Sequence, residues 1–245
     1  MLFRSTPEET HFVIASEALK KGMNVFVEKP LALQKKHAAH LIELAKKYNL
    51  TLFTDYIFLF DPVARAIKKT LFDGELGELL AIRSTRLRAG VTKSNVSIYD
   101  DAAIHDIYLA RHFFDRKIKR VTALPRPTAD FLPNFGTAFF EISGGGKYIA
   151  EYSWQHHQDE RKMMIFGSLG YLSWEKHKGE DVLWSFFSGK KPTKRIFRKD
   201  KGSPLEKTVQ FFLEQTNSKN KKSAQELLNH QHYLQDVAML ESLRG

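Results

Sequence analysis

The first 56 residues alternate between helical and extended patterns, and this alternation constrains the fold more than any other feature of the chain. Thr6-Pro7-Glu8-Glu9 combines a capping residue, a first-turn proline and a capping-box glutamate, and it predicts a helix that runs to Gly22. Apolar runs at residues 24–28 and 51–56 predict buried strands, and the helical spacing at 34–48 predicts the helix between them. This alternation indicates parallel βαβ units, and therefore an α/β region with ligand-binding loops at the carboxyl ends of its strands.

The pattern changes beyond this region, where strands with short connections replace the alternation. Asp61-Pro62 predicts the start of a helix that ends at Gly74. Further helices are expected at 101–114, 205–215 and 224–243, and strands at 79–88, 118–124, 135–143, 147–156, 162–167 and 182–187. Because adjacent strands with short connections pair antiparallel, residues 57–245 are expected to form an α+β domain with an open, mainly antiparallel sheet.

Composition excludes several classes of chemistry and of partner. The chain has no cysteine, which excludes disulfides, thiolate metal sites and a cysteine nucleophile. It has no apolar run as long as a membrane span and no secretory signal pattern, so a cytoplasmic protein without a membrane partner is expected. The net charge of +10 arises largely from residues 190–201 and from Lys219, Lys221 and Lys222, which are expected to lie in polar connections. Since no nucleic-acid motif accompanies this charge, no nucleic-acid partner is expected.

Two short motifs carry residues suited to proton transfer. Glu28-Lys29-Pro30 follows a predicted strand, and Pro30 fixes the backbone beside Lys29, so that a partly desolvated amine can exchange protons there. Asp101 precedes His105 by four residues, which places both on one face of a helix. Oxidation of an alcohol by hydride loss also needs a base for the hydroxyl proton, and His105 or Lys29 can supply one. Simpler roles stay open, since Lys29 could be a solvated surface residue and Asp101 a helix cap.

Together these segments resemble a known enzyme family. Ser5-Thr6-Pro7 with His11, Asn24 through Pro30, and Asp101 through Asp106 are similar to signatures of the glucose-fructose oxidoreductase, inositol dehydrogenase and MocA family. The resemblance covers essentially the whole chain. It implies that residues 1–56 are the carboxyl-terminal portion of a dinucleotide-binding (Rossmann) domain, and that residues 57–245 form a domain for substrate binding and oligomerisation.

The resemblance also implies roles for individual residues. Lys29, Asp101 and His105 are assigned to substrate binding and proton transfer. The positions near an NAD or NADP cofactor are Thr6, Pro7, His11, Glu28, Lys29 and Pro30. The implied substrate is a sugar or sugar derivative, and the implied assembly is a homo-oligomer formed through the open sheet.

The chain departs from the family pattern at three points. No G-x-G-x-x-G occurs, so the pyrophosphate loop and the acidic ribose ligand are absent, and an amino-terminally truncated chain is expected. Without those residues, NAD and NADP cannot be told apart. Ala103 replaces a common glycine, and Tyr108 stands where a second acidic residue commonly follows the histidine, which bears on substrate class more than on fold.

The sequence therefore predicts an NAD(P)-dependent oxidoreductase that transfers a hydride between nicotinamide and a hydroxyl or keto carbon of a sugar, sugar nucleotide or polyol. The alternative is a non-catalytic sugar-binding or assembly module left by loss of the cofactor loop. This alternative predicts sugar binding or self-association without turnover, and binding that is unaffected by Lys29→Ala.

Two other motifs are interpreted as structural. Gly144-Gly145-Gly146-Lys147 lacks the spacing of a phosphate loop and predicts a hairpin turn between two strands. His156 and His157 are adjacent along a predicted strand, so their side chains are expected to point to opposite faces, and no metal site is expected.

Overall fold

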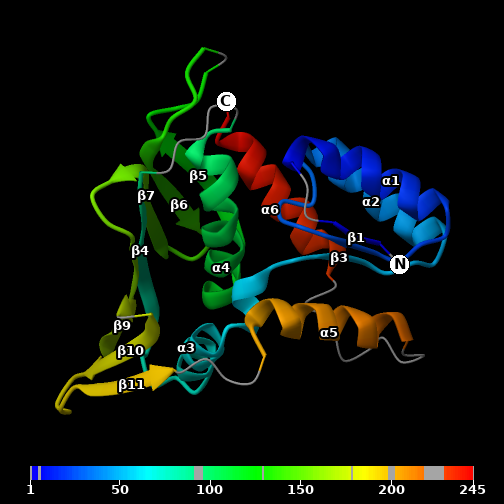
Figure 1. The fold of residues 1–245 in the computed structure, drawn as a ribbon. Coiled ribbons are helices and arrows are strands. Elements are labelled where there is room, and N and C mark those ends of the chain that lie inside the picture. Colours follow the sequence, from blue (N-terminus) through cyan, green and yellow to red (C-terminus); the bar gives the residue numbers. More distant parts are fainter. Residues whose placement is uncertain are drawn as a thin grey trace. The chain divides into compact units, whose positions relative to one another are not determined.

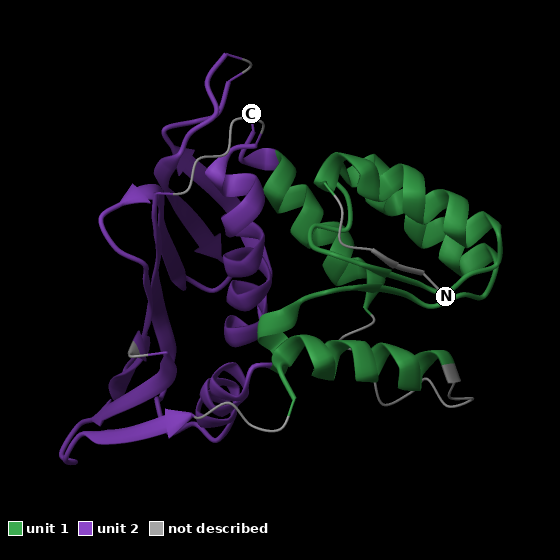
Figure 2. Cartoon of the chain, in the orientation of Figure 1, with its two compact units in different colours: residues 1–60, 202–241 green, residues 61–201, 242–245 purple. Residues whose placement is uncertain are grey.

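The computed structural model describes residues 2–4, 7–90, 96–128, 130–177, 179–197, 202–217 and 229–244. The chain forms two compact units, each with its own β-sheet (Figure 2). The first unit comprises residues 1–60 and 202–241, and the second comprises residues 61–201 and 242–245. A small parallel sheet together with a large, mainly antiparallel sheet confirms the predicted fold class. The division into domains at residue 56 stays a prediction.

The first unit contains three parallel strands in the order β1-β2-β3 (Figure 1). The strands are β1 (Leu2–Arg4), β2 (Val25–Val27) and β3 (Leu52–Thr54). They are connected by η1 (Glu8–Thr10), α1 (His11–Lys20) and α2 (Lys35–Lys47). Gly22 has a φ of 75°, a conformation that glycine adopts readily, and it ends the first helix where predicted. The predicted strands and helices are confirmed, and the predicted cap at Thr6 lies outside the described residues.

Phenylalanine side chains join the carboxyl-terminal part of the chain to the core of the first unit. Phe212 of α5 (Pro204–Asn217) is fully buried. Its ring centroid lies 5.6 Å from that of Phe26 on β2 and 6.2 Å from that of Phe53 on β3. α5 therefore covers one face of the small sheet, and α1 and α2 cover the other (Figure 1). The remaining elements are η2 (Ile57–Phe60) and α6 (His230–Ser242).

The second unit contains an eight-stranded sheet in the order β11-β10-β9-β8-β4-β7-β6-β5. β4 (Leu79–Ala89) lies inside the sheet, where it pairs in parallel with β7 (Lys147–His156) and antiparallel with β8 (Glu160–Gly167). The other pairs are antiparallel and involve β5 (Ile118–Leu124), β6 (Phe135–Ile142), β9 (Gly170–His177), β10 (Glu180–Phe187) and β11 (Thr193–Phe197). The helices α3 (Pro62–Phe72) and α4 (Ile104–Phe114) lie on one face of this sheet (Figure 1).

The sequence patterns do not predict β9 and β11. The polar composition of residues 190–201 predicts a connection, and this prediction is wrong for Thr193–Phe197, which forms β11 at the edge of the sheet. The ammonium of Lys194 lies 5.1 Å from the ring centroid of Trp184 on β10, so a lysine of the edge strand covers an aromatic surface. The lysines at 219, 221 and 222 lie outside the described residues.

The helix predicted at 101–114 begins two residues earlier and with a wider turn. Tyr99–Ala103 forms a π-helical turn, η3, and α4 continues directly from it. Asp101 therefore lies inside a helical turn and is not a cap. The cap at the start of α3 is confirmed, because the Asp61 carboxylate accepts a hydrogen bond from the Val63 amide at 2.8 Å.

The glycine run forms the predicted turn between β6 and β7, with φ of 86° at Gly144 and 102° at Gly145. The expectation for His156 and His157 is wrong, since their ring centroids lie 4.2 Å apart. β7 ends at His156, so the alternation of faces ends there too. Within the described part of the chain, no helix combines the length and apolar composition needed to cross a membrane.

Candidate active site

In the first unit, the Glu28-Lys29-Pro30 segment directly follows β2 and is held by a buried histidine. His11, the first residue of α1, is 1% exposed, and its Nδ1 donates to the carbonyl oxygen of Pro30 at 2.8 Å. A carbonyl only accepts hydrogen bonds, so this contact places a proton on Nδ1. Pro30 is buried, whereas Glu28 and Lys29 are half-buried. His11 therefore fixes the loop in which Lys29 stands, at the carboxyl end of a parallel strand.

The other predicted cofactor residues lie just before this helix. Pro7 is exposed, and its carbonyl accepts hydrogen bonds from the amide of Thr10 at 2.9 Å and from the hydroxyl of Thr10 at 2.7 Å. The structure thus brings His11, Lys29 and Pro30 together. Thr6 lies outside the described residues.

A buried carboxyl that the sequence analysis did not select lies at the same edge of the sheet. Asp55 follows β3, is 3% exposed, and donates its amide to the carbonyl of Val27 at 2.8 Å. Burial and the nearby negative charge of Glu28 raise the pKa of Asp55 to about 7, against the opposing effect of a hydrogen bond with Thr208 on α5. Its carboxyl group can therefore exchange a proton near neutral pH. In the sequence, the observation that could have singled out Asp55 is an aspartate that directly follows an apolar strand.

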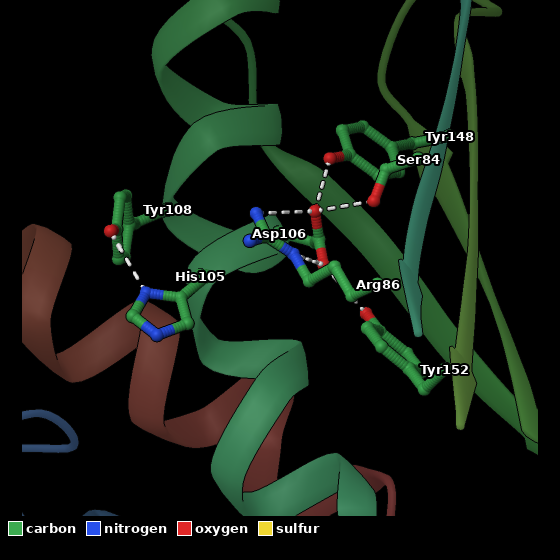
Figure 3. A network of polar contacts seen from close by, with 7 residues as sticks. All are labelled: Ser84, Arg86, His105, Asp106, Tyr108, Tyr148 and Tyr152. Carbon is green, nitrogen blue, oxygen red and sulfur yellow. Dashed lines mark hydrogen bonds and ion pairs between the residues drawn. The ribbon is translucent and has the colours of Figure 1, made fainter. Parts of the chain in front are cut away.

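In the second unit, Asp101 and His105 belong to one continuous helical segment. Asp101 lies in η3 and His105 in the first turn of α4, and both are half-buried. Nδ1 of His105 lies 3.0 Å from Oη of Tyr108, and the two rings are nearly perpendicular, at 79° (Figure 3). The phenol of Tyr108 is therefore one hydrogen-bond partner of His105.

Asp106, the residue after His105, is the centre of a buried polar network (Figure 3). Its carboxylate accepts hydrogen bonds from Ser84 at 2.8 Å, Tyr148 at 2.5 Å and Tyr152 at 3.0 Å. Arg86 donates to it from Nε at 2.9 Å and from Nη2 at 3.2 Å. Burial and the negative charge of Asp106 raise the pKa of both tyrosines well above the usual value, so both remain neutral donors.

The same carboxylate keeps Arg86 charged. Burial alone would lower the pKa of Arg86, and the charge and hydrogen bonds of Asp106 outweigh that effect and raise it. Because Arg86 stands on β4 and Tyr148 and Tyr152 on β7, the network ties the start of α4 to the centre of the sheet. It therefore fixes the backbone that carries His105. In the sequence, the observation that could have indicated this network is Ser84 and Arg86 two residues apart on one face of β4, with Tyr148 and Tyr152 four residues apart on one face of β7.

Comparison with known proteins agrees with this arrangement. The family model described as "Oxidoreductase family, NAD-binding Rossmann fold" matches residues 3–56, and the model "GFO/IDH/MocA C-terminal domain" matches residues 64–173. The chain belongs to the GFO/IDH/MocA family. The predicted family membership is thereby confirmed, and the small parallel sheet falls in the part that matches the NAD-binding model.

Curated relatives of this family member are oxidoreductases by name. The "Uncharacterized oxidoreductase YrbE" of Bacillus subtilis is 24% identical over 181 residues, which cover 69% of this chain and 53% of the relative. The UDP-N-acetylglucosamine 3-dehydrogenase of Acidithiobacillus ferrooxidans is 25% identical over 169 residues, with the same coverage of 69% and 53%. The myo-inositol 2-dehydrogenase of Thermotoga maritima is 30% identical over 124 residues, which cover 49% of this chain and 36% of the relative. The chain spans about half or less of the length of these relatives.

Solved structures show the same fold. KijD10, a 3-ketoreductase from Actinomadura kijaniata in complex with TDP-benzene and NADP, superposes with a TM-score of 0.85 at 18% identity, covering 99% of this chain and 76% of that one. An inositol dehydrogenase homolog from Azotobacter vinelandii, complexed with NADH and myo-inositol, gives a TM-score of 0.80 at 18% identity and the same coverage of 99% and 76%. The predicted two-part architecture is that of these enzymes.

Proposed function

We propose that this chain belongs to an NAD(P)-dependent oxidoreductase that transfers a hydride between nicotinamide and a hydroxyl or keto carbon of a sugar, sugar nucleotide or polyol. The observation that carries the proposal is the half-buried Lys29 in a loop fixed by His11, at the carboxyl end of a strand in the NAD-binding part. Relatives named as dehydrogenases support an enzyme over the alternative of a non-catalytic module. We place this enzyme in the cytoplasm, in line with a chain without cysteine.

The residues present fit the nicotinamide end of the cofactor. Ligands of parallel sheets bind at the carboxyl ends of the strands, where Glu28 and Lys29 are partly exposed. We assign cofactor contacts to Thr6, Pro7, His11, Glu28, Lys29 and Pro30, with His11 acting chiefly by holding Pro30. No G-x-G-x-x-G occurs in the sequence, so the contacts assigned to these residues concern the nicotinamide end of the cofactor. The bound nicotinamide would supply hydride exchange with a substrate carbon.

Lys29, Asp101 and His105 are proposed to handle the substrate and its proton. Removal of a hydride from an alcohol carbon leaves a hydroxyl proton that must pass to a base, and an amine or imidazole can accept it. Asp101 is assigned to orientation of the substrate. The Asp106 network holds α4 on the sheet, and thus holds the position of His105.

We expect Lys29→Met to lower kcat of nicotinamide-linked turnover by about 10²- to 10⁴-fold, the usual contribution of a positioned acid or base. The assay would use the full chain with NAD⁺ or NADP⁺ and a panel of myo-inositol, UDP-N-acetylglucosamine and a TDP-sugar. Lys20→Met is the matched control, because Lys20 is an exposed lysine at the end of α1. Failure of both NADH and NADPH to bind in a fluorescence titration, or full activity of Lys29→Met, would contradict the proposal.

We also propose that the open face of the eight-stranded sheet joins copies of this chain. Leu124, Phe135, Phe139, Ile149 and Ile196 are exposed on strands of this sheet. Phe139 and Ile149 are register partners on β6 and β7, so their side chains lie on the same face. An exposed apolar surface of this kind is typical of an interface between subunits.

The double substitution Phe139→Glu/Ile149→Lys is expected to reduce the number of subunits in the oligomer, because it places charges on the apolar surface. The chain is expected to remain folded, because both side chains are about 40% exposed. Sedimentation velocity would measure the change. Phe72→Glu is the control, since Phe72 is 86% exposed and lies on α3. An unchanged sedimentation coefficient in the double variant would contradict this assembly.

A further inference from the structure

Glu28 and Asp55 stand side by side at the carboxyl end of the small sheet, within the first unit. Each residue directly follows a strand, and the last residues of these two strands, Val27 and Thr54, are register partners. The Asp55 amide donates to the Val27 carbonyl at 2.8 Å, so the pairing of the two chains continues to Asp55. The structure therefore places two carboxyl-bearing residues at the edge where ligands of parallel sheets bind.

The side chain of Asp55 lies on the face of the sheet that α5 covers. Phe53 stands two residues earlier on β3, and its ring centroid lies 6.2 Å from that of Phe212 on α5. Side chains at every second position of a strand share a face, and the hydrogen bond between Asp55 and Thr208 of the same helix agrees with this. Asp55 is thus enclosed between the sheet and α5, and it is 3% exposed.

This environment gives little support to a negative charge on Asp55. Its Oδ1 atom has no hydrogen-bond partner among the residues that the structure describes. The Thr208 hydroxyl has a single proton, which the carbonyl of Leu205 also accepts at 2.7 Å. Burial and the negative charge of Glu28 raise the pKa of Asp55 to about 7. Asp55 therefore changes its charge near neutral pH, where an ordinary aspartate is fully ionised.

The two redox forms of nicotinamide differ in charge. The oxidised ring carries a positive charge and the reduced ring is neutral, so a nearby carboxylate attracts the oxidised form selectively. This attraction is stronger in partly buried surroundings than in bulk water. A carboxyl group that ionises near neutral pH, at the edge that fits the nicotinamide end, can therefore discriminate between the two forms.

We propose that Asp55 sets the preference of this site between oxidised and reduced nicotinamide, because ionised Asp55 favours the oxidised form and neutral Asp55 does not. This inference rests on the proposed function. By linkage, the oxidised cofactor favours the ionisation of Asp55 to the same extent. Binding of the oxidised cofactor, and with it the oxidation of substrate, is then favoured above about pH 7.

The affinities of the full chain for both redox forms test this inference. They would be measured by calorimetry at about pH 6 and about pH 8.5, on either side of the pKa of Asp55, with NAD⁺ and NADH or with NADP⁺ and NADPH, whichever pair binds more tightly. In the wild type, we expect the preference for the oxidised form to increase about tenfold between these pH values, the size of one charge interaction in partly buried surroundings.

Asp55→Asn is expected to keep the low-pH preference at both pH values and to bind both forms like the wild type at about pH 6. A merely structural role of Asp55 would weaken both forms alike. His11 and His230 belong to the same unit and stay in place in this variant, so a lost pH dependence is due to Asp55. Glu43→Gln, which removes an exposed carboxylate from α2, is the matched control and keeps the wild-type pH dependence.

The ionisation of Asp55 can also be measured without cofactor. The chain would be labelled with ¹³C-aspartate, and the carboxyl resonance of Asp55, assigned from Asp55→Asn, followed over pH. We expect a pKa of about 7 in the free chain. With the oxidised cofactor bound, the pKa should be about one unit lower than with the reduced cofactor, which corresponds to a tenfold preference.

Asp55 that is ionised throughout the range from about pH 5 to about pH 8 in the free chain overturns the inference. The same preference for the oxidised form at both pH values overturns it as well, and leaves the proposed function in place. Failure of both redox forms to bind contradicts the proposed function, and the inference with it.

Discussion

Replacement of Asp106 by alanine is expected to lower the free energy of unfolding of the second unit by about 3 to 5 kcal/mol, the usual effect of removing one partner of a buried ion pair. Asp106 has 0% side-chain exposure and Arg86 has 14%, so the variant leaves a guanidinium buried without its counter-charge. Ser84, Tyr148 and Tyr152 lose an acceptor at the same time. Burial of polar groups without hydrogen bonds adds to the destabilisation.

Urea unfolding followed by tryptophan fluorescence measures this effect, because all three tryptophans, Trp154, Trp174 and Trp184, belong to the second unit. Asp73→Ala is the control, because its partner Lys69 is exposed and exposed ion pairs contribute little to the free energy of unfolding.

The double variant Arg86→Leu/Asp106→Leu is expected to recover the part of the stability lost through the uncompensated charge of Arg86, since apolar pairs often replace buried ion pairs without loss. The part lost through the hydroxyls of Ser84, Tyr148 and Tyr152 should remain, because their acceptor is still missing. A loss below about 1 kcal/mol in Asp106→Ala would show that the network does not hold α4 on the sheet.

The sequence predicts local features of this protein well. The strand before Glu28, the helix stop at Gly22 and the cap at Asp61 follow from periodicity and turn chemistry within a few residues, and the structure confirms each of them. Lys29 could be selected because it stands at the end of such a strand. The prediction failed for His156 and His157 because it assumed that the strand continued beyond its end.

Features that depend on distant residues could not be predicted in this way. Asp106 is important because Arg86 lies 20 residues earlier and Tyr148 lies 42 residues later, and only the pairing of β4 with β7 brings them together. Asp55 is buried in part by α5, which carries Thr208 from the far end of the chain. In each case the local pattern shows a polar residue beside apolar ones, and tertiary packing decides its charge and its partners.

Asp55→Asn is expected to stabilise the first unit at neutral pH and to remove most of a pH dependence that the wild type shows. Burial and the charge of Glu28 raise the pKa of Asp55 from 3.8 to about 7, so the folded state binds more protons than the unfolded state between these values. Stability therefore falls as pH rises from about 4 to about 7, by roughly 4 kcal/mol at most. Asparagine does not ionise, so the variant gains stability relative to the wild type above about pH 7 and little near pH 4.

Amide hydrogen exchange of β2 and β3, recorded over a range of urea concentrations, measures the free energy of unfolding of the first unit at each pH. The exchange rates are corrected for the effect of pH on exchange from the unfolded chain. Glu43→Gln, which removes an exposed carboxylate from α2, should keep the wild-type slope. Glu28→Gln should reduce the slope in part, because it removes the second cause of the raised pKa and leaves burial. An equal slope in wild type and Asp55→Asn would exclude Asp55 as its source. If the fall in stability with pH is present in the wild type and lost in Asp55→Asn, then ionisation of Asp55 destabilises the fold at neutral pH. Such a destabilising carboxyl is typical of functional sites, and Asp55 lies at the sheet edge that carries Lys29.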